Sequence, residues 1–557
     1  MSTASSTAST PTMPPGKVLQ AISGIMAAFF VVMLSSTVVA TSLPVIVSDL
    51  GGSQGDYTWV VTANLLTMAV TTPIWGKLAD RLNRKVLILV ALGTFALASA
   101  AGGFATDTTW LIVCRLVQGA GVGGMVALGQ VAIADVVSPR ERGKYMGVMG
   151  AVMGVAQLGG PLLGGVVTDL IGWRWNFFLP VPIAVVAGLL IALTLRSPKF
   201  PQQGRFDYLG SVLVLSGFGL LLAWLGLGGS AFAWDSATSL VLGATSIVLV
   251  LLTIGWELRA KEPIIPLGLF AQRTFVLTTV SSLAVGVTIY GASVFVSQYL
   301  QIARGYTPTE SGFLQMPLVI GSLLTSVLLG QLISRTGRWK AAMTASAGIL
   351  VVGLVLMGTL RYDTSIWLVG GYLALLGIGA GGLMQNLVLV LQNSLRATQL
   401  GAGTGSHTFV RSLGGTIGVT ALGAVLTSGV GARLSDGLAS LGAEVLEQTA
   451  CAPGLEVIRS GALPNVRELC GPVQTVVESV YGDGIATVFL WIVPLAILTL
   501  LAVAFLPNRP LSKKNALQQL AEELDSAPIA PRSDAAGSTA TTSPTAGVPE
   551  QGQRDDG

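Results

Sequence analysis

Gly76-Lys77-Leu78-Ala79-Asp80-Arg81-Leu82-Asn83-Arg84-Lys85 is a charged stretch between two long apolar segments. A related stretch recurs far along the chain, as Gly330-Gln331-Leu332-Ile333-Ser334-Arg335-Thr336-Gly337-Arg338-Trp339-Lys340. Each begins with glycine, carries an arginine five residues later and ends with basic residues. A repeated basic loop between apolar segments predicts a chain built from two related halves.

The composition indicates an integral membrane protein. Of the 557 residues 52% are hydrophobic and only 10% are charged, and the mean hydropathy is +0.72. A soluble protein of this size needs a more polar surface. With three Cys and one His, the chain is poor in metal ligands, so we expect no metal and no cofactor.

Two glycine patterns resemble a nucleotide-binding fingerprint and are set aside. Gly119-x-Gly121-x-x-Gly124 and Gly377-x-Gly379-x-x-Gly382 both lie inside apolar segments, without the preceding strand that such a site requires. The sequence therefore predicts neither a nucleotide cofactor nor an enzyme.

About fourteen apolar segments, each of about 20 residues, are long enough to cross a bilayer. They lie near residues 19–43, 57–76, 86–105, 110–134, 144–168, 177–195, 208–228, 237–256, 275–299, 312–333, 341–360, 366–391, 404–428 and 485–506. Lys and Arg are concentrated in the connections that share a side with the loop at 76–85. This bias predicts a multi-pass protein of the cytoplasmic (inner) cell membrane with both termini cytoplasmic.

The same pattern predicts the domain organisation. We expect two six-helix bundles, separated by two additional helices and flanked by polar, disordered tails. The predicted order is a tail over 1–17, a bundle over 18–196, the additional helices and linkers over 197–273, a bundle over 274–507, and a tail over 508–557. The second bundle carries an outer loop near 430–483, in which Cys451 and Cys470 form either a disulfide or two free thiols.

Three stretches together resemble the major facilitator superfamily, and specifically its fourteen-span drug:proton antiporter branch. The first is the loop at 76–85, which is similar to the family's loop between spans two and three. The second is Arg115-Leu116-Val117-Gln118-Gly119-Ala120-Gly121, similar to an R-x-x-Q-G-x-G element. The third, Gly154-Val155-Ala156-Gln157-Leu158-Gly159-Gly160-Pro161-Leu162-Leu163-Gly164-Gly165, is similar to an antiporter element. Trp173-Arg174-Trp175 and the number of spans agree with that branch.

The resemblance implies an all-α polytopic membrane protein with two six-helix bundles plus two additional spans. It further implies a secondary active efflux transporter, which exports amphipathic drugs or toxic compounds by proton antiport with alternating access. The partners would be a small hydrophobic or amphipathic substrate, protons and the lipid bilayer, with no nucleic acid. Two alternatives stay open: a dedicated exporter of an endogenous metabolite or lipid, and a membrane receptor or scaffold that uses the outer loop.

The resemblance also implies a conformational latch formed by Gly76, Asp80, Arg81, Arg84 and Asp135. In this hypothesis Asp80 caps the start of a following helix, and Arg81 or Arg84 reaches Asp135 at the end of span four. The alternative is a solvated loop whose ion pairs contribute under about 1 kcal/mol.

Span five combines close helix packing with a bend. Its small residues allow two backbones to touch, and Pro161 removes a helix hydrogen bond. The residues concerned are Gly154, Gly159, Gly160, Pro161, Gly164 and Gly165.

Three charged or titratable residues lie within apolar spans. Arg115 must face a cavity or a partner there, either as an electrostatic element of transport or as a structural clamp. Arg411 and His407 lie one helical turn apart, and His407 is either a proton site or a satisfied polar group.

The chain departs from the family pattern at three positions. Asn83 replaces a glycine of the loop, Pro180 follows the Trp-Arg-Trp stretch where asparagine is common, and Ser35 replaces a buried acid of span one. Because Ser35 leaves the buried arginines without that acid, we expect neutral or anionic substrates. Candidate cavity residues, with packing as the alternative, are Ser35, Phe29, Met33, Tyr290, Phe295, Tyr299 and Phe409.

Overall fold

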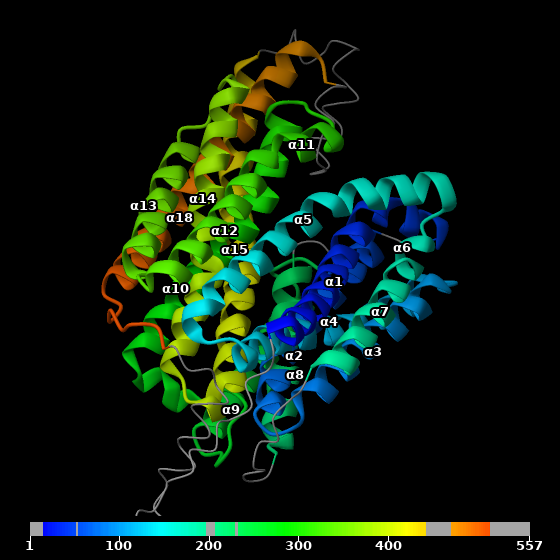
Figure 1. Cartoon of the computed structure of the whole chain (residues 1–557). Coiled ribbons are helices and arrows are strands. Elements are labelled where there is room, and N and C mark those ends of the chain that lie inside the picture. The colour runs from blue at the N-terminus through cyan, green and yellow to red at the C-terminus, as the bar shows by residue number, and fades with distance from the viewer. Residues whose placement is uncertain (1–14, 52–53, 196–205, 229–231, 442–468, 513–557) are drawn as a thin grey trace, which may run out of the picture.

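The computed structural model describes residues 15–51, 54–195, 206–228, 232–441 and 469–512. Within these ranges it is helical throughout and contains no named strand, so the predicted all-α fold is confirmed. The predicted tails fall almost wholly on residues 1–14 and 513–557, which lie outside the described ranges. Helices of the first half, blue to cyan in Figure 1, lie beside those of the second half, green to orange.

The first half forms one bundle around a core centred on Phe29, Phe95 and Met125. Its helices are α1 (Pro15–Asp49), α2 (Gln54–Ala79), α3 (Arg84–Gly103), α4 (Thr108–Val136), α5 (Pro139–Ile171), α6 (Trp175–Phe178) and α7 (Pro180–Thr194). Pro180 begins α7, where the missing N–H of proline costs no helix hydrogen bond.

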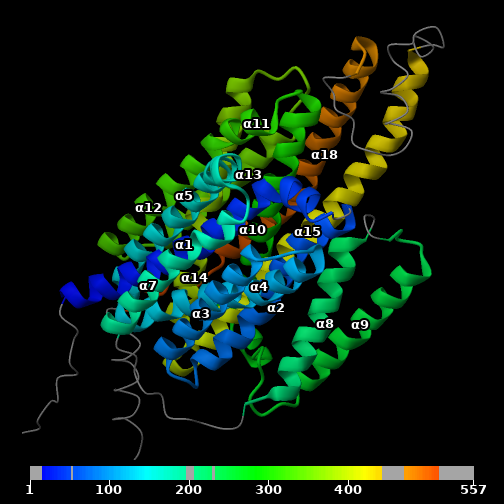
Figure 2. The same ribbon diagram turned by 90° about the vertical axis from the view of Figure 1, so that its right-hand side faces the viewer.

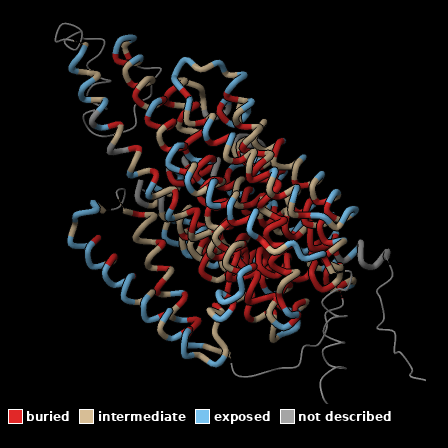
Figure 3. The backbone as a smooth tube through the Cα atoms, turned by 90° about the vertical axis from the view of Figure 1, so that its left-hand side faces the viewer, coloured by how far each residue is buried: buried red, intermediate tan, exposed pale blue. Residues whose placement is uncertain are grey.

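The second half forms a separate core around Phe295, Leu350 and Phe489. Its elements are α10 (Arg273–Gln298), the π-helical turn η2 (Tyr299–Ala303), α11 (Pro308–Leu314), α12 (Met316–Thr336), α13 (Lys340–Met357), α14 (Ile366–Ser394), α15 (Leu400–Ser440) and α18 (Gly471–Ala504). Between the halves, α8 (Tyr208–Leu227) and α9 (Ala237–Glu257) pair with one another beside α2. Buried residues concentrate in the interior of the helical body (Figure 3).

Twelve of the described helical segments are long and apolar enough to cross a membrane. The helices α2, with 26 residues, and α5, with 33, pack among them but are not in that set. The prediction of fourteen spans therefore stays a prediction.

The outer loop predicted over 430–483 is narrower in the structure. Helix α15 continues to Ser440 and α18 already begins at Gly471, so both helices project beyond the rest of their bundle (Figure 2). The reason is that a polar or small-residue segment forms a helix as readily as an apolar one, so the end of an apolar stretch does not mark the end of a helix. Cys451 lies outside the described residues, and its disulfide with Cys470 stays a prediction.

The two glycine patterns that resemble a nucleotide fingerprint are packing surfaces. A side chain on Gly119 would overlap the carbonyl oxygen of Asn64 on α2, and one on Gly121 would lie 2.7 Å from a backbone atom of α3. In the second half, Gly377 and Gly379 meet α12 and α13 in the same way. The pattern thus lets the fourth helix of each half approach two neighbours closely.

Candidate functional site

The loop at 76–85 closes one end of the seam between the two bundles, which we call the latch end. The Asp80 carboxylate accepts hydrogen bonds from the backbone N–H groups of Gly401 and Ala402, both at 2.7 Å. These residues begin α15, whose first N–H groups have no partner within the helix. Asp80 therefore joins the first bundle to the positive end of a helix in the second.

Asp80 thus contacts the start of a later helix, α15, and not that of α3, the next helix along the chain. Asn83 caps α3 instead: its Oδ1 accepts a hydrogen bond from the N–H of Lys85 at 3.0 Å. The φ of Asn83 is −61°, so the backbone at this position does not require glycine.

Arg84 lies at the centre of the latch and is only 1% exposed. Its guanidinium forms an ion pair with Asp135 at the end of α4, and lies 3.5 Å from Asp80. Nε also donates to the carbonyl of Ala79 at 2.8 Å. Of the two arginines considered for Asp135, the structure thus places Arg84 there.

Arg81 turns to a different partner. It lies 3.3 Å from the carboxylate of Glu262, and Lys77 donates to the same carboxylate at 2.8 Å. Glu262 follows α9, so this ion-pair cluster joins the additional helices to the latch. Sequence reasoning missed Glu262, because nothing in one sequence links a residue of that linker to the loop at 76–85.

Burial of Asp80 raises its pKa to about 6, although Arg84 and the N–H groups of Ala402 and Gly401 favour the charged form. Lys77 also favours it. An acid with a pKa in this range changes charge within the pH span of cells and vesicles. The latch therefore contains one titratable group at the contact between the bundles.

Glycines bring the backbones together at the same seam. A Cβ on Gly76 would overlap the carbonyl oxygen of Gly401 on α15, so the two helices touch backbone to backbone. Gly330 of α12 contacts Gly143 of α5 in the same manner. The two halves thus meet through glycine contacts on both sides of the seam.

Arg142 is a second buried arginine at the latch end that the sequence analysis did not single out. It is 1% exposed and donates to Gln392 Oε1 and to the carbonyl of Ala134, both at 2.9 Å. Gln392, on α14, also donates to Thr404 Oγ1 at 3.2 Å. A glutamine inside an apolar span was the available signal, since such a residue needs partners.

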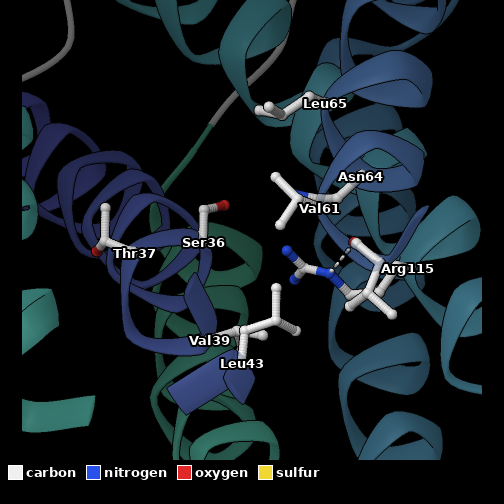
Figure 4. A pocket seen from close by; sticks show the side chains of 9 residues that line it. Ser36, Thr37, Val39, Leu43, Val61, Asn64, Leu65 and Arg115 are labelled. Carbon is white, nitrogen blue, oxygen red and sulfur yellow. Dashed lines mark hydrogen bonds between the residues drawn. The ribbon is translucent and has the colours of Figure 1, made fainter. Parts of the chain in front are cut away.

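Arg115 lies in the other part of the first bundle and faces a cavity (Figure 4). It is 3% exposed; Nε donates to the carbonyl of Val60 at 3.3 Å and Nη1 donates to Gln118 Oε1 at 2.7 Å. The guanidinium points into the space between α1 and α2. The cavity has a volume of about 210 Å³ and is lined by Ser36, Thr37, Val39, Leu43, Val60, Val61, Asn64, Leu65 and Arg115.

His407 and Arg411 lie on one face of α15, inside the second bundle. His407 is fully buried, and its two ring nitrogens have no hydrogen-bond partner among the described residues. Arg411 is 7% exposed and packs against Gly286 of α10. The structure places neither residue at the latch or at the Arg115 cavity.

Most of the other predicted cavity residues pack inside the bundles. Phe29 and Phe295 belong to the two cores, and Phe409 stacks edge-on against Phe218 with ring centroids 5.0 Å apart. Tyr299 is buried and donates to the carbonyl of Arg361 at 2.7 Å. Met33 packs against the first core, Tyr290 covers Gly415, and Ser35 contacts Gln118 beside the cavity.

The small residues of α5 bring this helix close to α1 and α12. Gly160 would clash with Thr37 and Gly164 with the backbone of Val38 if either carried a side chain, whereas Gly154 faces α12. Gly159 and Gly165 have more room. The bend predicted at Pro161 concerns a residue whose side chain lies outside the described part of the structure.

Comparison with known proteins agrees with this arrangement. The Major Facilitator Superfamily model matches residues 25–419. The chain is 38% identical to the multidrug transporter protein MdtP of Bacillus subtilis over 419 residues, which are 75% of this chain and 77% of that one. It is 30% identical to multidrug resistance protein 3 of the same organism, and 33% identical to the efflux pump dotC of Dothistroma septosporum, covering 81% and 72% of those chains.

Solved structures share the fold at lower identity. The human organic anion transporter MFSD10 matches with a TM-score of 0.56 at 16% identity, covering 87% of this chain and all of that one. A bacterial homologue of the human lysosomal transporter Spinster, in an inward-facing conformation, matches with a TM-score of 0.54 at 14% identity, over 88% and 98% of the two chains. Two helical bundles, their glycine contacts and the matched sequence lead to one conclusion: the chain is a membrane transporter that belongs to the Major Facilitator Superfamily.

Proposed function

We propose that this protein exports amphipathic compounds across the cytoplasmic membrane by proton antiport with alternating access. The observation that carries the proposal is the contact of the Asp80 carboxylate with the N–H groups of Gly401 and Ala402 across the seam. This contact can open without unfolding either bundle, because each bundle has its own hydrophobic core. Alternating access by rocking requires two rigid bundles and a contact between them that can open and close.

The position of the Arg115 cavity supports the same mechanism. Val60 and Leu65 lie on α2 at about 20 Å or more from its end at Ala79, by the rise of a helix. The cavity therefore lies away from the latch, toward the opposite side of the membrane. With the latch closed, a compound in the cavity would be separated from the latch end and nearer the other side.

The direction of export rests on charge. The loop at 76–85 carries Lys77, Arg81, Arg84 and Lys85, and such loops stay in the cytoplasm. The latch end is then cytoplasmic, both termini are cytoplasmic, and compounds leave on the side of α15 and α18 that projects. Helices α2 and α5 complete fourteen spans in this topology.

The test is transport into proteoliposomes with an imposed pH gradient. A protonophore-sensitive accumulation of fluorescent amphipathic compounds is expected when the interior is acidic, because outward proton flow then drives uptake. Protein-free vesicles give the passive background. Accumulation that ignores the gradient contradicts proton coupling, and a profile restricted to one compound class indicates a dedicated exporter.

Two variants link the assay to the latch. Asp80→Asn removes the charge at the seam and is expected to reduce transport at least tenfold. Asp235→Asn changes an exposed acid of the connection before α9 and is expected to leave transport unchanged. Equal activity of both variants contradicts a role of the latch in transport.

A further inference from the structure

We propose that the cavity at Arg115 binds the anionic group, a carboxylate, of the transported compound. This inference rests on the proposed efflux function, since the carboxylate is taken to belong to the substrate. It begins from the charge balance of the cavity. Among its lining residues Arg115 is the single charged one, and no acidic residue lines it in the part of the chain that the structure describes.

The contacts of Arg115 leave its charge without a counter-charge. Its described acceptors are the carbonyl oxygen of Val60 and the amide oxygen of Gln118, both uncharged. Each of the ion pairs found among the described residues lies elsewhere. A buried cation of this kind is unfavourable in a membrane, and an anion in the cavity would offset that cost.

Three described acids lie at the same end of the bundle: Asp49, Asp56 and Asp107. Asp56, in the first turn of α2, does not line the cavity. Asp49 accepts hydrogen bonds from Trp173 and Arg174 at 2.9 and 3.1 Å. Asp107 accepts the N–H of Trp110 at 2.8 Å and begins α4. Neither lines the cavity. The counter-charge of Arg115 is therefore not supplied by these three neighbouring carboxylates.

The rest of the cavity suits an amphipathic carboxylate. Asn64 is buried, and its Oδ1 has no partner among the described residues, so its amide can turn either its N–H₂ or its oxygen toward a ligand. The Ser36 hydroxyl also points toward the cavity (Figure 4). Val39, Leu43, Val61 and Leu65 supply an apolar wall. At about 210 Å³ the cavity is smaller than a typical drug site, so it holds the acidic end of a larger compound.

Arg411 provides a contrast that favours this site. It too is buried and has no carboxylate within ion-pair distance among the described residues. Its backbone and side chain, however, pack directly on Gly286, and it does not line the described cavity. Of these two arginines, Arg115 is the one that lines the described cavity.

The decisive experiment measures equilibrium binding to the purified full-length protein. The probes are 2-naphthoate, 2-naphthamide and 2-naphthylmethylammonium, which share one ring system and differ in charge. We expect 2-naphthoate to bind at least tenfold more tightly than the ammonium compound. Arg115→Gln should weaken 2-naphthoate at least tenfold and the amide less than threefold, and Arg115→Lys should restore part of the difference.

A second pair of variants tests the charge while Arg115 remains. Ser35 Oγ accepts a hydrogen bond from Gln118 Nε2 at 3.5 Å, and Gln118 in turn contacts Arg115. Ser35→Asp adds a carboxylate to this series of hydrogen bonds next to Arg115, whereas Ser35→Asn adds a side chain of similar size without a charge. We expect Ser35→Asp to weaken 2-naphthoate at least tenfold more than Ser35→Asn does.

The results separate this inference from the proposed transport. Ammonium binding as tight as naphthoate binding overturns the anion site, as does equal naphthoate affinity in Ser35→Asp and Ser35→Asn. If proteoliposome transport ignores the pH gradient while naphthoate binding depends on Arg115, proton coupling fails and the anion site stands. If transport follows the pH gradient but 2-naphthoate binds no more tightly than the ammonium compound, proton coupling stands and the anion site fails.

Discussion

The loops at 76–85 and 330–340 lie at the same place in the two halves, and they close the seam in different ways. Each is preceded by a glycine contact, Gly76 on Gly401 and Gly330 on Gly143. Beyond the glycines the first loop buries a set of charges around Arg84. The second has Ser334 at the place of Asp80, and its Arg338 is exposed.

The second seam uses backbone carbonyls as acceptors where the first uses carboxylates. The guanidinium of Arg140, at the start of α5, donates to the carbonyl of Arg335 at 3.3 Å, and its backbone N–H donates to the carbonyl of Ser512 at 3.1 Å. The chain that follows α18 thus crosses to the first bundle. Carbonyl acceptors do not titrate, whereas a buried carboxylate does. The difference favours the α5–α12 side as the pivot and the α2–α15 side as the part that opens.

The largest expected difference between the loops concerns their arginines. Arg84→Gln leaves Asp135 and Asp80 buried without their cation, and we expect a loss of about 3–5 kcal/mol in the free energy of unfolding. Arg338→Gln changes an exposed side chain and should cost under about 0.5 kcal/mol. Denaturant unfolding in detergent measures both. Equal losses would show that the two loops are energetically alike.

The second prediction concerns pH. The pKa of Asp80 is raised from 3.8 to about 6 in the closed latch, so the closed form binds the proton more tightly than an open, solvated one. The closed form therefore gains stability as pH falls from about 6 toward 4, by at most about 3 kcal/mol. Spin labels at the exposed positions Leu82 and Arg396, one on each side of the latch, lie closer together when the latch is closed. The population with the short label-to-label distance should be larger at pH 4.5 than at pH 7.5.

Asp80→Asn is the control for that measurement, because it keeps the shape of the side chain and removes the titration. A short-distance population that falls with falling pH contradicts the prediction. A pH response that is unchanged in Asp80→Asn assigns it to another group. The cations that act on Asp80 are Arg84 and Lys77, and Arg84 is shared with Asp135.

The sequence was sufficient for the helices and for one pairing within a half. Apolar segments predicted where helices lie, and the resemblance to the family implied Asp135 as the partner of Arg81 or Arg84. The contacts across the seam were not predictable in this way. Gly401 and Glu262 are far from the loop along the chain, and only the packed fold brings them to Asp80 and Lys77.

The Arg115 cavity shows the same limit. Its buried arginine followed from charge inside an apolar segment, and the absence of an acid followed from Ser35. The space in front of the guanidinium is a property of how α1, α2 and α4 pack. Conversely, Phe29, Phe295 and Phe409 were plausible cavity residues by type, but aromatic side chains fill cores at least as well, and burial decides between the two uses.

The third prediction tests what the two loops share. Gly76→Ala and Gly330→Ala each place a methyl group against a backbone carbonyl of the opposite bundle, and each should cost about 1–3 kcal/mol by overpacking. Gly93→Ala, whose Cβ would meet nothing within 4 Å, is the control and should be neutral or slightly stabilising. Thermal unfolding compares the three. A cost at Gly76 alone would mean that the α5–α12 seam yields more easily than the α2–α15 seam, against its assignment as the pivot.

The smallest expected difference concerns the residue at which each loop turns. Asn83 caps α3 through its side chain, whereas Gly337 ends α12 through its backbone at φ 70°. Asn83→Ala should lower the free energy of unfolding by about 1 kcal/mol, and Asn83→Gly by only a few tenths, since glycine is also accepted at a helix start.

Gly337→Ala should lower the free energy of unfolding by about 1 kcal/mol because the backbone there is left-handed. Gly337→Asn should cost less, because asparagine tolerates that region. Unfolding of the four variants checks the pattern, and hydrogen exchange locates the Asn83→Ala loss in the first turn of α3. Equal costs for Asn83→Ala and Asn83→Gly would contradict the side-chain cap.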